Sequence, residues 1–398
     1  MRAHLWAVGG GVVLGLAAAL ASQALGPRSR RTAAAWLLAP PICTALVGIA
    51  LLLRAQDTFD PRAFESPTFY ARGAELGQLL EVAETAQTKG RRYSSSVQRT
   101  LSGYATLLNA GGSLSPVSTE PPAVQISDLH GNRLVLGPLR RLFSGRPVFL
   151  VGDFGQRGTP AEADALVPQM TRLGDELVAV SGNHDSSYFM RRLAGAGVTV
   201  LTDRGRLRPD GSVDGKPVRR IAGLLLAGWP DPLEWRGPDP DDPRRVFSFA
   251  EHPHPNREYA QATRRLVRWF EGLRPSPDVV LVHQNGLAQR LARDVHARLP
   301  GRELLILTGH DHKQHLDRDG DVLVVDARTV GAGGLFGVGT ESVGLAELHL
   351  ADGEVLPRAV DLIGVEPVSG AANAERVVVG SSRACERENV RCHERESG

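Results

Sequence analysis

The chain has 398 residues, of which 46 are basic and 44 acidic, so its formal net charge is only +2. This length allows one sizeable folded domain with further segments attached. The balanced charge and an aromatic content of 5% give no sign of a nucleic-acid-binding surface. Three cysteines define no disulfide framework, and the sequence leaves open whether Cys385 and Cys392 in the polar tail are bonded or free.

Two apolar segments stand at the start of the chain, at residues 5–26 and 33–53. Each is about 20 residues long, which is enough to cross roughly 30 Å of hydrocarbon as a helix. Residues 1–54 are therefore predicted to form two transmembrane helices joined by a short arginine-rich loop. The alternative is a buried hairpin in a soluble protein, which such long uncharged runs do not favour.

The loop between these segments carries Arg28, Arg30 and Arg31. Cytoplasmic loops are enriched in Lys and Arg, so we expect this loop in the cytoplasm and both flanks outside it. The prediction is a multi-pass protein of the cell membrane whose large C-terminal part is extracytoplasmic. Arg54 follows the second segment and weakens the charge asymmetry, and Ala19–Ala21 could form a signal-peptidase site, so cleavage of the first segment stays open.

The remainder of the chain divides by pattern into three regions. Residues 55–120 show helical periodicity and then a Gly, Ser and Pro-rich stretch, which predicts a helical stalk and a linker. Residues 121–365 alternate short apolar runs with helical patterns, which predicts an α/β domain. Residues 366–398 form a charged tail, expected to be partly disordered. The expected strands are residues 123–127, 147–152, 176–182, 197–201, 221–228, 279–284, 303–309 and 321–326.

Polar side chains follow five of these apolar runs at their carboxyl ends. They are Asp128 and His130, Asp153, Asn183 and His184, His283, and finally His310 and His312. In open α/β sheets this edge is where ligands bind. Oxygen and imidazole donors without cysteine suit Mn, Fe or Zn. The set is large enough for two ions about 3.5–4 Å apart, which can activate water and hold a phosphoryl group.

Each motif alone has an ordinary structural explanation. An Asp-x-His in a turn is commonly an Asx-turn beside a histidine, and a single histidine after a strand is commonly a hydrogen-bonded core residue. The occurrence of all the motifs in one order, each at the end of a strand, makes these explanations improbable together.

The motifs read "SDLHG", "GDFGQRG", "GNHD", "VHQ" and "GHDH" in this order. In these residues the chain resembles the calcineurin-like metallophosphoesterases, over about residues 121 to 345. The resemblance implies a four-layer α/β/β/α sandwich with a dinuclear metal site. With the two apolar segments in front, we expect a membrane-anchored bacterial member of that family.

The resemblance also implies a role for each motif residue. Asp128, His130 and His312 match the ligands of one metal ion. Asn183, His283 and His310 match those of the other ion, and Asp153 matches the bridging carboxylate. His184 matches the histidine that contacts the phosphate and protonates the leaving group. The expected reaction is hydrolysis of a phosphate ester by a metal-bridging hydroxide, with two divalent ions as cofactors.

One motif departs from the pattern of the phosphoprotein phosphatases. Gln156 stands where those enzymes have an aspartate that orients the catalytic histidine, so another group, for example Asp185 or a backbone carbonyl, is expected to orient His184 here. Arg157 falls where they place a phosphate-binding arginine, but it could equally be a solvated arginine in a turn. The missing aspartate argues against the protein-phosphatase branch. A phosphoprotein phosphatase is still kept as the first rival function, and a non-catalytic scaffold with the same fold is a less favoured one. The sequence does not specify the phosphate-ester substrate, the metal or the oligomeric state.

Overall fold

The structure is a computed structural model that describes residues 121–133, 135–236, 255–333, 341–351, 353–366, 369 and 371–379. By internal contacts the chain divides into two units, Met1–Thr88 and Lys89–Gly398, and the described residues all belong to the second. The two predicted membrane segments and the predicted stalk lie outside the described residues. Within the described ranges, no helix is both long and apolar enough to span a membrane.

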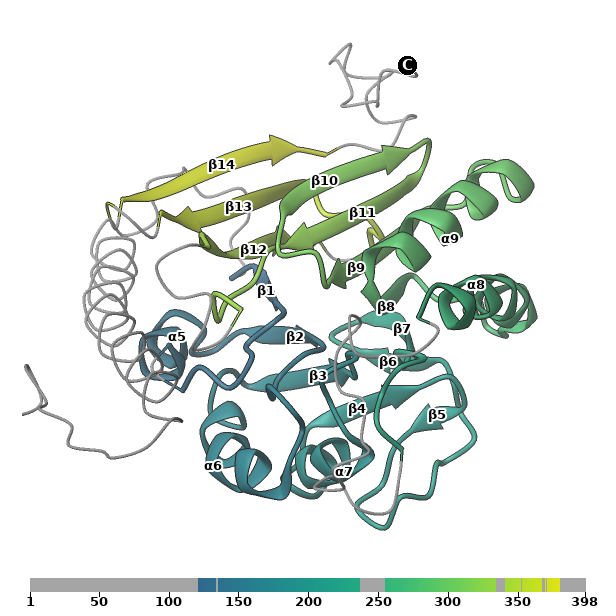
Figure 1. Ribbon diagram of the computed structural model, residues 1–398. Helices are drawn as coiled ribbons and strands as arrows, with labels where there is room; N and C mark the ends of the chain where they lie inside the picture. Colours follow the sequence, from purple (N-terminus) through teal and green to yellow (C-terminus); the bar gives the residue numbers. More distant parts are fainter. Residues whose placement is uncertain are drawn as a thin grey trace, which may run out of the picture. The chain divides into compact units, whose positions relative to one another are not determined.

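Eight strands form the first sheet, in the order β14-β13-β12-β1-β2-β3-β4-β5 (Figure 1). Strands β1 to β4 run parallel, whereas β12, β13 and β14 extend the sheet from β1 as antiparallel neighbours. The strands are β1 (Ala123–Ile126), β2 (Pro147–Val151), β3 (Glu176–Val180), β4 (Thr199–Thr202), β5 (Gly205–Arg206), β12 (Val343–His349), β13 (Ala359–Val365) and β14 (Ala372–Val378).

Six strands form the second sheet, in the order β10-β11-β9-β8-β7-β6. Its centre is again parallel, from β7 through β8 and β9 to β11, and β6 and β10 close its edges as antiparallel strands. The strands are β6 (Arg219–Ile221), β7 (Leu224–Trp229), β8 (Val279–Gln284), β9 (Leu304–Gly309), β10 (Gln314–Asp319) and β11 (Val322–Ala327).

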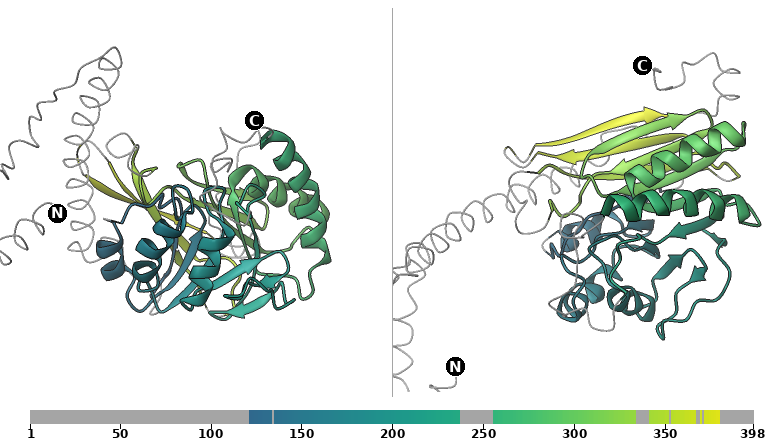
Figure 2. Two further views of the ribbon diagram at one scale, coloured as in Figure 1. Left: turned by 60° about the horizontal axis from the view of Figure 1, so that its bottom comes forward. Right: turned by 45° about the vertical axis from the view of Figure 1, so that its right-hand side comes forward.

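Three apolar cores show how these sheets are layered. One core joins the first sheet to α5 (Leu136–Leu142), α6 (Pro160–Met170) and α7 (Ser187–Gly195). A second lies between the two sheets. The third joins the second sheet to α8 (Pro255–Gly272) and α9 (Asn285–Arg298), which lie side by side in both views of Figure 2. The central parallel strands are buried on both faces, which explains their continuous apolar sequences.

Two glutamines join the sheets by hydrogen bonds across the central core. Gln125 of β1 donates from Nε2 to the carbonyls of Thr308 and Val325, at 2.8 and 3.0 Å. Gln314 of β10 donates to Leu345 and Ile363, both at 3.1 Å. A polar side chain in an apolar layer is tolerated when it is hydrogen-bonded in this way.

The predicted α/β class is confirmed, with two sheets and helices on their outer faces. All eight predicted strands are present, within a few residues of their expected bounds. The first sheet continues past residue 365, where the domain was expected to end, because β14 pairs with β13 from Ala372 to Val378. Its residues are half-buried or exposed on both faces, so β14 lacks the apolar pattern that marked the other strands. The rest of the predicted tail, beyond residue 379, lies outside the described residues.

Candidate metal centre

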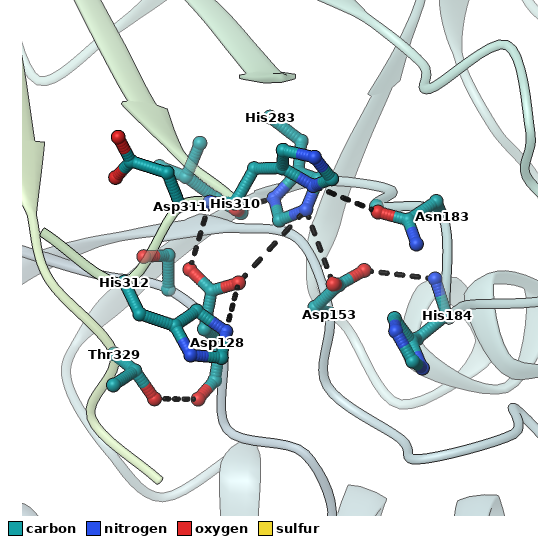
Figure 3. A network of polar contacts seen from close by, with 12 residues as sticks. Asp128, Asp153, Asn183, His184, His283, His310, Asp311, His312 and Thr329 are labelled. Carbon is teal, nitrogen blue, oxygen red and sulfur yellow. Dashed lines mark hydrogen bonds and ion pairs between the residues drawn. The ribbon is translucent and has the colours of Figure 1, made fainter. Parts of the chain in front are cut away.

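The candidate site lies at the carboxyl ends of β1, β2, β3, β8 and β9, where the two sheets meet (Figure 3). Five of the predicted ligands have positive φ angles: Asp128 (55°), His130 (46°), Asp153 (57°), His310 (83°) and His312 (59°). Residues other than glycine rarely adopt this conformation, which costs about 1–3 kcal/mol each. Strain concentrated in this way marks a place where side-chain direction matters more than local stability.

Asp128, His130 and His312 form one group of candidate ligands. The Nε2 atoms of His130 and His312 lie 3.7 and 3.4 Å from Asp128 Oδ1, and 3.1 Å from each other. The other carboxylate oxygen, Asp128 Oδ2, accepts the backbone N–H of His310 at 3.1 Å. One oxygen of Asp128 is thus held by the protein, and the second faces the two imidazoles.

Asp153, His283 and His310 form a second group. His283 Nε2 lies 3.2 Å from Asp153 Oδ2, while its Nδ1–H donates to the carbonyl of Val151 at 2.7 Å. That bond fixes the ring and directs Nε2 into the site. The amide oxygen of Asn183 lies 3.0 Å from His310 Nδ1, so both predicted ligand atoms point at the same space.

Asp153 also belongs to a third group with His130 and His184, and so faces both ligand sets. This position matches the bridging role that the resemblance implies for it. Asp153 Oδ1 accepts the backbone N–H of His184 at 2.9 Å, which leaves Oδ2 toward His130 and His283.

His184 lies beside this centre, with its ring 4.7 Å from that of His130 in an edge-to-face arrangement. Its Nδ1 lies 2.8 Å from the backbone carbonyl of Gln156, which accepts the Nδ1–H and leaves Nε2 toward the site. Of the two alternatives left open by the sequence, the backbone carbonyl is the one that orients His184.

Asp185, the other residue considered for orienting His184, instead binds backbone N–H groups. Its buried carboxylate accepts the backbone N–H groups of Asp153, Phe154, Gly155 and Gly182, at 2.8 to 3.3 Å. It therefore holds the strained loop after β2 against the loop after β3. Sequence reasoning missed this role, although the carboxylate directly after the Asn-His pair was a visible signal.

The glycine of the Gly-Asn-His-Asp motif is required by close packing. A Cβ atom on Gly182 would collide with the carboxylate of Asp153. The same holds for Gly309, where a Cβ would lie 2.7 Å from Asp128 Oδ2. Both motifs therefore keep a glycine where the backbone of one strand touches a ligand carried by another.

Glu341 is a second residue that the sequence analysis missed. Its Oε2 lies 2.7 Å from His312 Nδ1, so it accepts that N–H and leaves His312 Nε2 toward Asp128. It is 29 residues away from His312 in sequence and follows a glycine-rich run, so no motif marked it.

Arg157 is exposed on the loop after β2, where its backbone N–H donates to Glu162. It belongs to none of the ligand groups described above, and its role in substrate binding stays a prediction.

The donor set fits divalent metal ions. Asp128 Oδ1 and His283 Nε2 are buried, and their nearest described neighbours, His312 Nε2 at 3.4 Å and Asp153 Oδ2 at 3.2 Å, do not form hydrogen bonds of good geometry with them. Such groups are costly to leave unsatisfied. Both point to the centre, and carboxylate oxygen with imidazole nitrogen is the donor chemistry of Zn, Mn and Fe sites.

The charges of the site shift its protonation equilibria. Burial lowers the pKa of His184 and outweighs the attraction of Asp153. Burial also lowers the pKa of His310, to about 4. Burial would lower the pKa of His312 too, but its contacts with Asp128 and Glu341 raise it to about 10. Without metal, Asp128 thus favours a protonated His312, and metal binding must release that proton.

Comparison with known proteins identifies the family. A family profile described as the calcineurin-like phosphoesterase superfamily domain matches residues 123–347, more than half of the chain. The chain belongs to this superfamily. The matched range begins at β1 and ends in β12, and it contains every residue that the sequence analysis assigned to the site. A search of curated proteins gives no match.

Several solved structures are similar to this chain, and the following three are described as different proteins. A Vps29 single mutant from Entamoeba histolytica is 13% identical with a TM-score of 0.31, covering 65% of this chain and 99% of that one. A putative 5'-nucleotidase from Staphylococcus aureus is 17% identical (TM-score 0.33; 65% and 54%). The phosphopantetheinyl hydrolase PptH from Mycobacterium tuberculosis is 15% identical (TM-score 0.35; 54% and 91%). Similarity this low carries no conclusion about substrate or partner.

Proposed function

We propose that this chain is a membrane-anchored, metal-dependent hydrolase of phosphate esters. The observation that carries the proposal is that the predicted ligand side chains of five strand ends point at one centre, with Asp153 facing both ligand sets. Asp128, His130 and His312 would hold one divalent ion, and Asn183, His283 and His310 the other. Two such ions, when bound, would supply Lewis acidity and an activated water.

In this reaction the protein's own residues orient the imidazole rings of His283 and His184 and supply one proton to the leaving group. The carbonyls of Val151 and Gln156 hold the Nδ1–H groups of His283 and His184, so both Nε2 atoms face the centre. A second proton on His184 would sit on Nε2, where a leaving alkoxide could take it. Burial lowers the pKa of His184, so its imidazolium is a stronger acid than a free one, but a smaller fraction of His184 carries the second proton near pH 7.

Substitutions of His184 and of Asp153 should have different effects on activity and on metal content. His184→Ala should lower turnover of an alkyl phosphate ester with Mn²⁺ by about 100- to 10,000-fold, the range of one general acid, and leave the metal content unchanged. Turnover of p-nitrophenyl phosphate or bis-p-nitrophenyl phosphate should fall less, because p-nitrophenolate leaves without needing a proton. Asp153→Ala should lose both activity and metal, because it faces both ligand sets. The measurements are steady-state rates and elemental analysis of the purified 398-residue chain.

Matched controls are the exposed residues His296 and Asp164, whose alanine variants should behave as the wild type. Full activity in Asp153→Ala would disprove the dinuclear site. A wild type that binds metal but cleaves none of these esters, nor any of a panel of phosphopeptides, would favour the non-catalytic scaffold. Cleavage of phosphopeptides alone would favour the phosphoprotein phosphatase.

A further inference from the structure

A second group of potential ligands lies on the outer face of the second sheet. It consists of Asp311, His315 and Asp326, whose ligand atoms all lie within 4.8 Å of one another. His315 and Asp326 are direct partners in the β10–β11 ladder, and Asp311 stands in the turn between β9 and β10. In Figure 3 the carboxylate of Asp311 points away from Asp128 and Asp153, so it serves neither ligand set of the main centre.

The alternation of β11 places Asp326 toward helix α9. Leu323 and Val325 pack into the core between the sheets, whereas Val322 and Val324 pack with the α9 helix. Asp326 shares the side of Val322 and Val324 and is fully buried. Asp326 therefore lies in an interior layer, where a carboxylate without partners is costly, whereas Asp311 and His315 are half-buried.

Asp326 is only half satisfied in this layer. Its Oδ1 accepts the backbone N–H of Arg328 at 3.0 Å. Its Oδ2 is buried and makes no hydrogen bond to any described residue, and the same is true of His315 Nε2. Among the described residues, this nitrogen forms an ion pair only with Asp317, whose Oδ2 is 3.7 Å away, too far for a hydrogen bond.

A comparable group elsewhere in the chain shows how such charges are normally balanced. Glu347, His349 and Asp361 also lie within ligand distance of one another. There Arg376 binds Asp361 with two nitrogens, at 2.6 and 2.7 Å, and Arg146 binds Glu347 at 2.8 Å. Among the described residues, no lysine or arginine side chain forms such an ion pair with Asp311 or Asp326.

We propose that Asp311, His315 and Asp326 bind a third divalent cation, Zn²⁺ or Mn²⁺, outside the dinuclear centre. Two carboxylates and one imidazole are suitable donors for these ions. Asp311 is already positioned for the task, because its Oδ2 accepts from Asn285 at 2.6 Å and its Oδ1 from the backbone of Lys313 at 2.9 Å. Ligands around a tetrahedral Zn²⁺ lie about 3.4 Å apart, so a small contraction of the group would complete the site.

The test is a count of bound ions in the purified 398-residue chain, dialysed against Zn²⁺ and analysed for metal per chain. The wild type should bind one ion more than His315→Ala and one more than Asp326→Asn. Two control variants should keep the wild-type ion count. Asp319→Asn removes a carboxylate charge, as Asp326→Asn does, from the face of β10 that carries His315. His296→Ala removes an exposed histidine. Sites elsewhere on the surface are common to all variants and cancel in the difference.

Both variants should fold. Asp326→Asn keeps a side-chain oxygen that can accept the backbone N–H of Arg328, and His315→Ala changes a residue that is only half-buried. If both variants bind as many ions as the wild type, the third site does not exist. The inference does not rest on the proposed function, because the ion count involves no substrate. If the wild type shows no phosphoesterase activity but still binds one ion more than the His315→Ala and Asp326→Asn variants, only the proposed function is refuted.

Discussion

At the scale of single residues, the site combines strained backbones with well-held side chains. Asp128, Asp153 and His312 have positive φ angles, yet each side chain has a hydrogen-bonded neighbour that fixes its direction. The residues of the candidate metal centre could be proposed from the sequence, because they follow apolar runs. The residues that hold them could not: Glu341 and the carbonyl of Gln156 reach the site only through folding.

Glu341 is predicted to act as a positioning residue for His312. Glu341→Gln replaces the carboxylate that accepts the Nδ1–H with a weaker, neutral amide acceptor, so His312 should be held less firmly and bind metal more weakly. Loss of such a partner typically costs about 10- to 100-fold in metal affinity. The measurement is Zn²⁺ affinity by competition with a chelator. Glu354→Gln, on the surface pair with Arg358, is the control, and equal affinities in the two variants would refute the role.

At the scale of elements, the buried parallel strands were predictable and the strands that extend the first sheet were not. The strands β1, β2 and β3 carry no charged residue within their apolar runs, whereas β12 and β13 each carry an acidic residue, Glu347 and Asp361, inside the strand. These charges are compatible with a sheet only because partners on neighbouring elements neutralise them. A single sequence does not show such partners.

Asp361 should make the stability of this sheet depend on pH. Burial alone would raise its pKa, but hydrogen bonds from Arg376 and His349 outweigh burial and lower it. A depressed pKa means that the stabilisation is present above the unfolded value, about 4, and is lost as the pH falls below it. The thermal midpoint of Asp361→Asn should therefore lie below that of the wild type at pH 7, and the difference should shrink below about pH 4.

The matched control is again Glu354→Gln, because its pair with Arg358 is half-exposed and surface pairs contribute little. Its midpoint should stay near that of the wild type throughout the range. A difference for Asp361→Asn that grows on acidification would contradict the assignment of a depressed pKa.

At the scale of the whole molecule, the candidate metal centre depends on the two sheets keeping their relative position, since each contributes ligands. Gln125 joins them in the buried core. In Gln125→Ala the carbonyls of Thr308 and Val325 lose their partner, so unfolding free energy should fall by about 1–3 kcal/mol. Gln314→Ala should cost less, because Gln314 is half-buried and water can replace it. Denaturant unfolding measures both, and equal losses would contradict this difference.

The prediction of membrane anchoring for the N-terminal region is based on the sequence alone. If residues 5–26 and 33–53 span the membrane, Arg28, Arg30 and Arg31 should hold their loop in the cytoplasm. Alkaline phosphatase fused after residue 398 should then be active, and a fluorescent protein fused there should stay dark. Replacing the three arginines with alanine should reduce phosphatase activity, because it removes the charge that sets the orientation. Bright fluorescence with inactive phosphatase in the unmodified chain would place the phosphoesterase domain in the cytoplasm and limit its substrates to those found there.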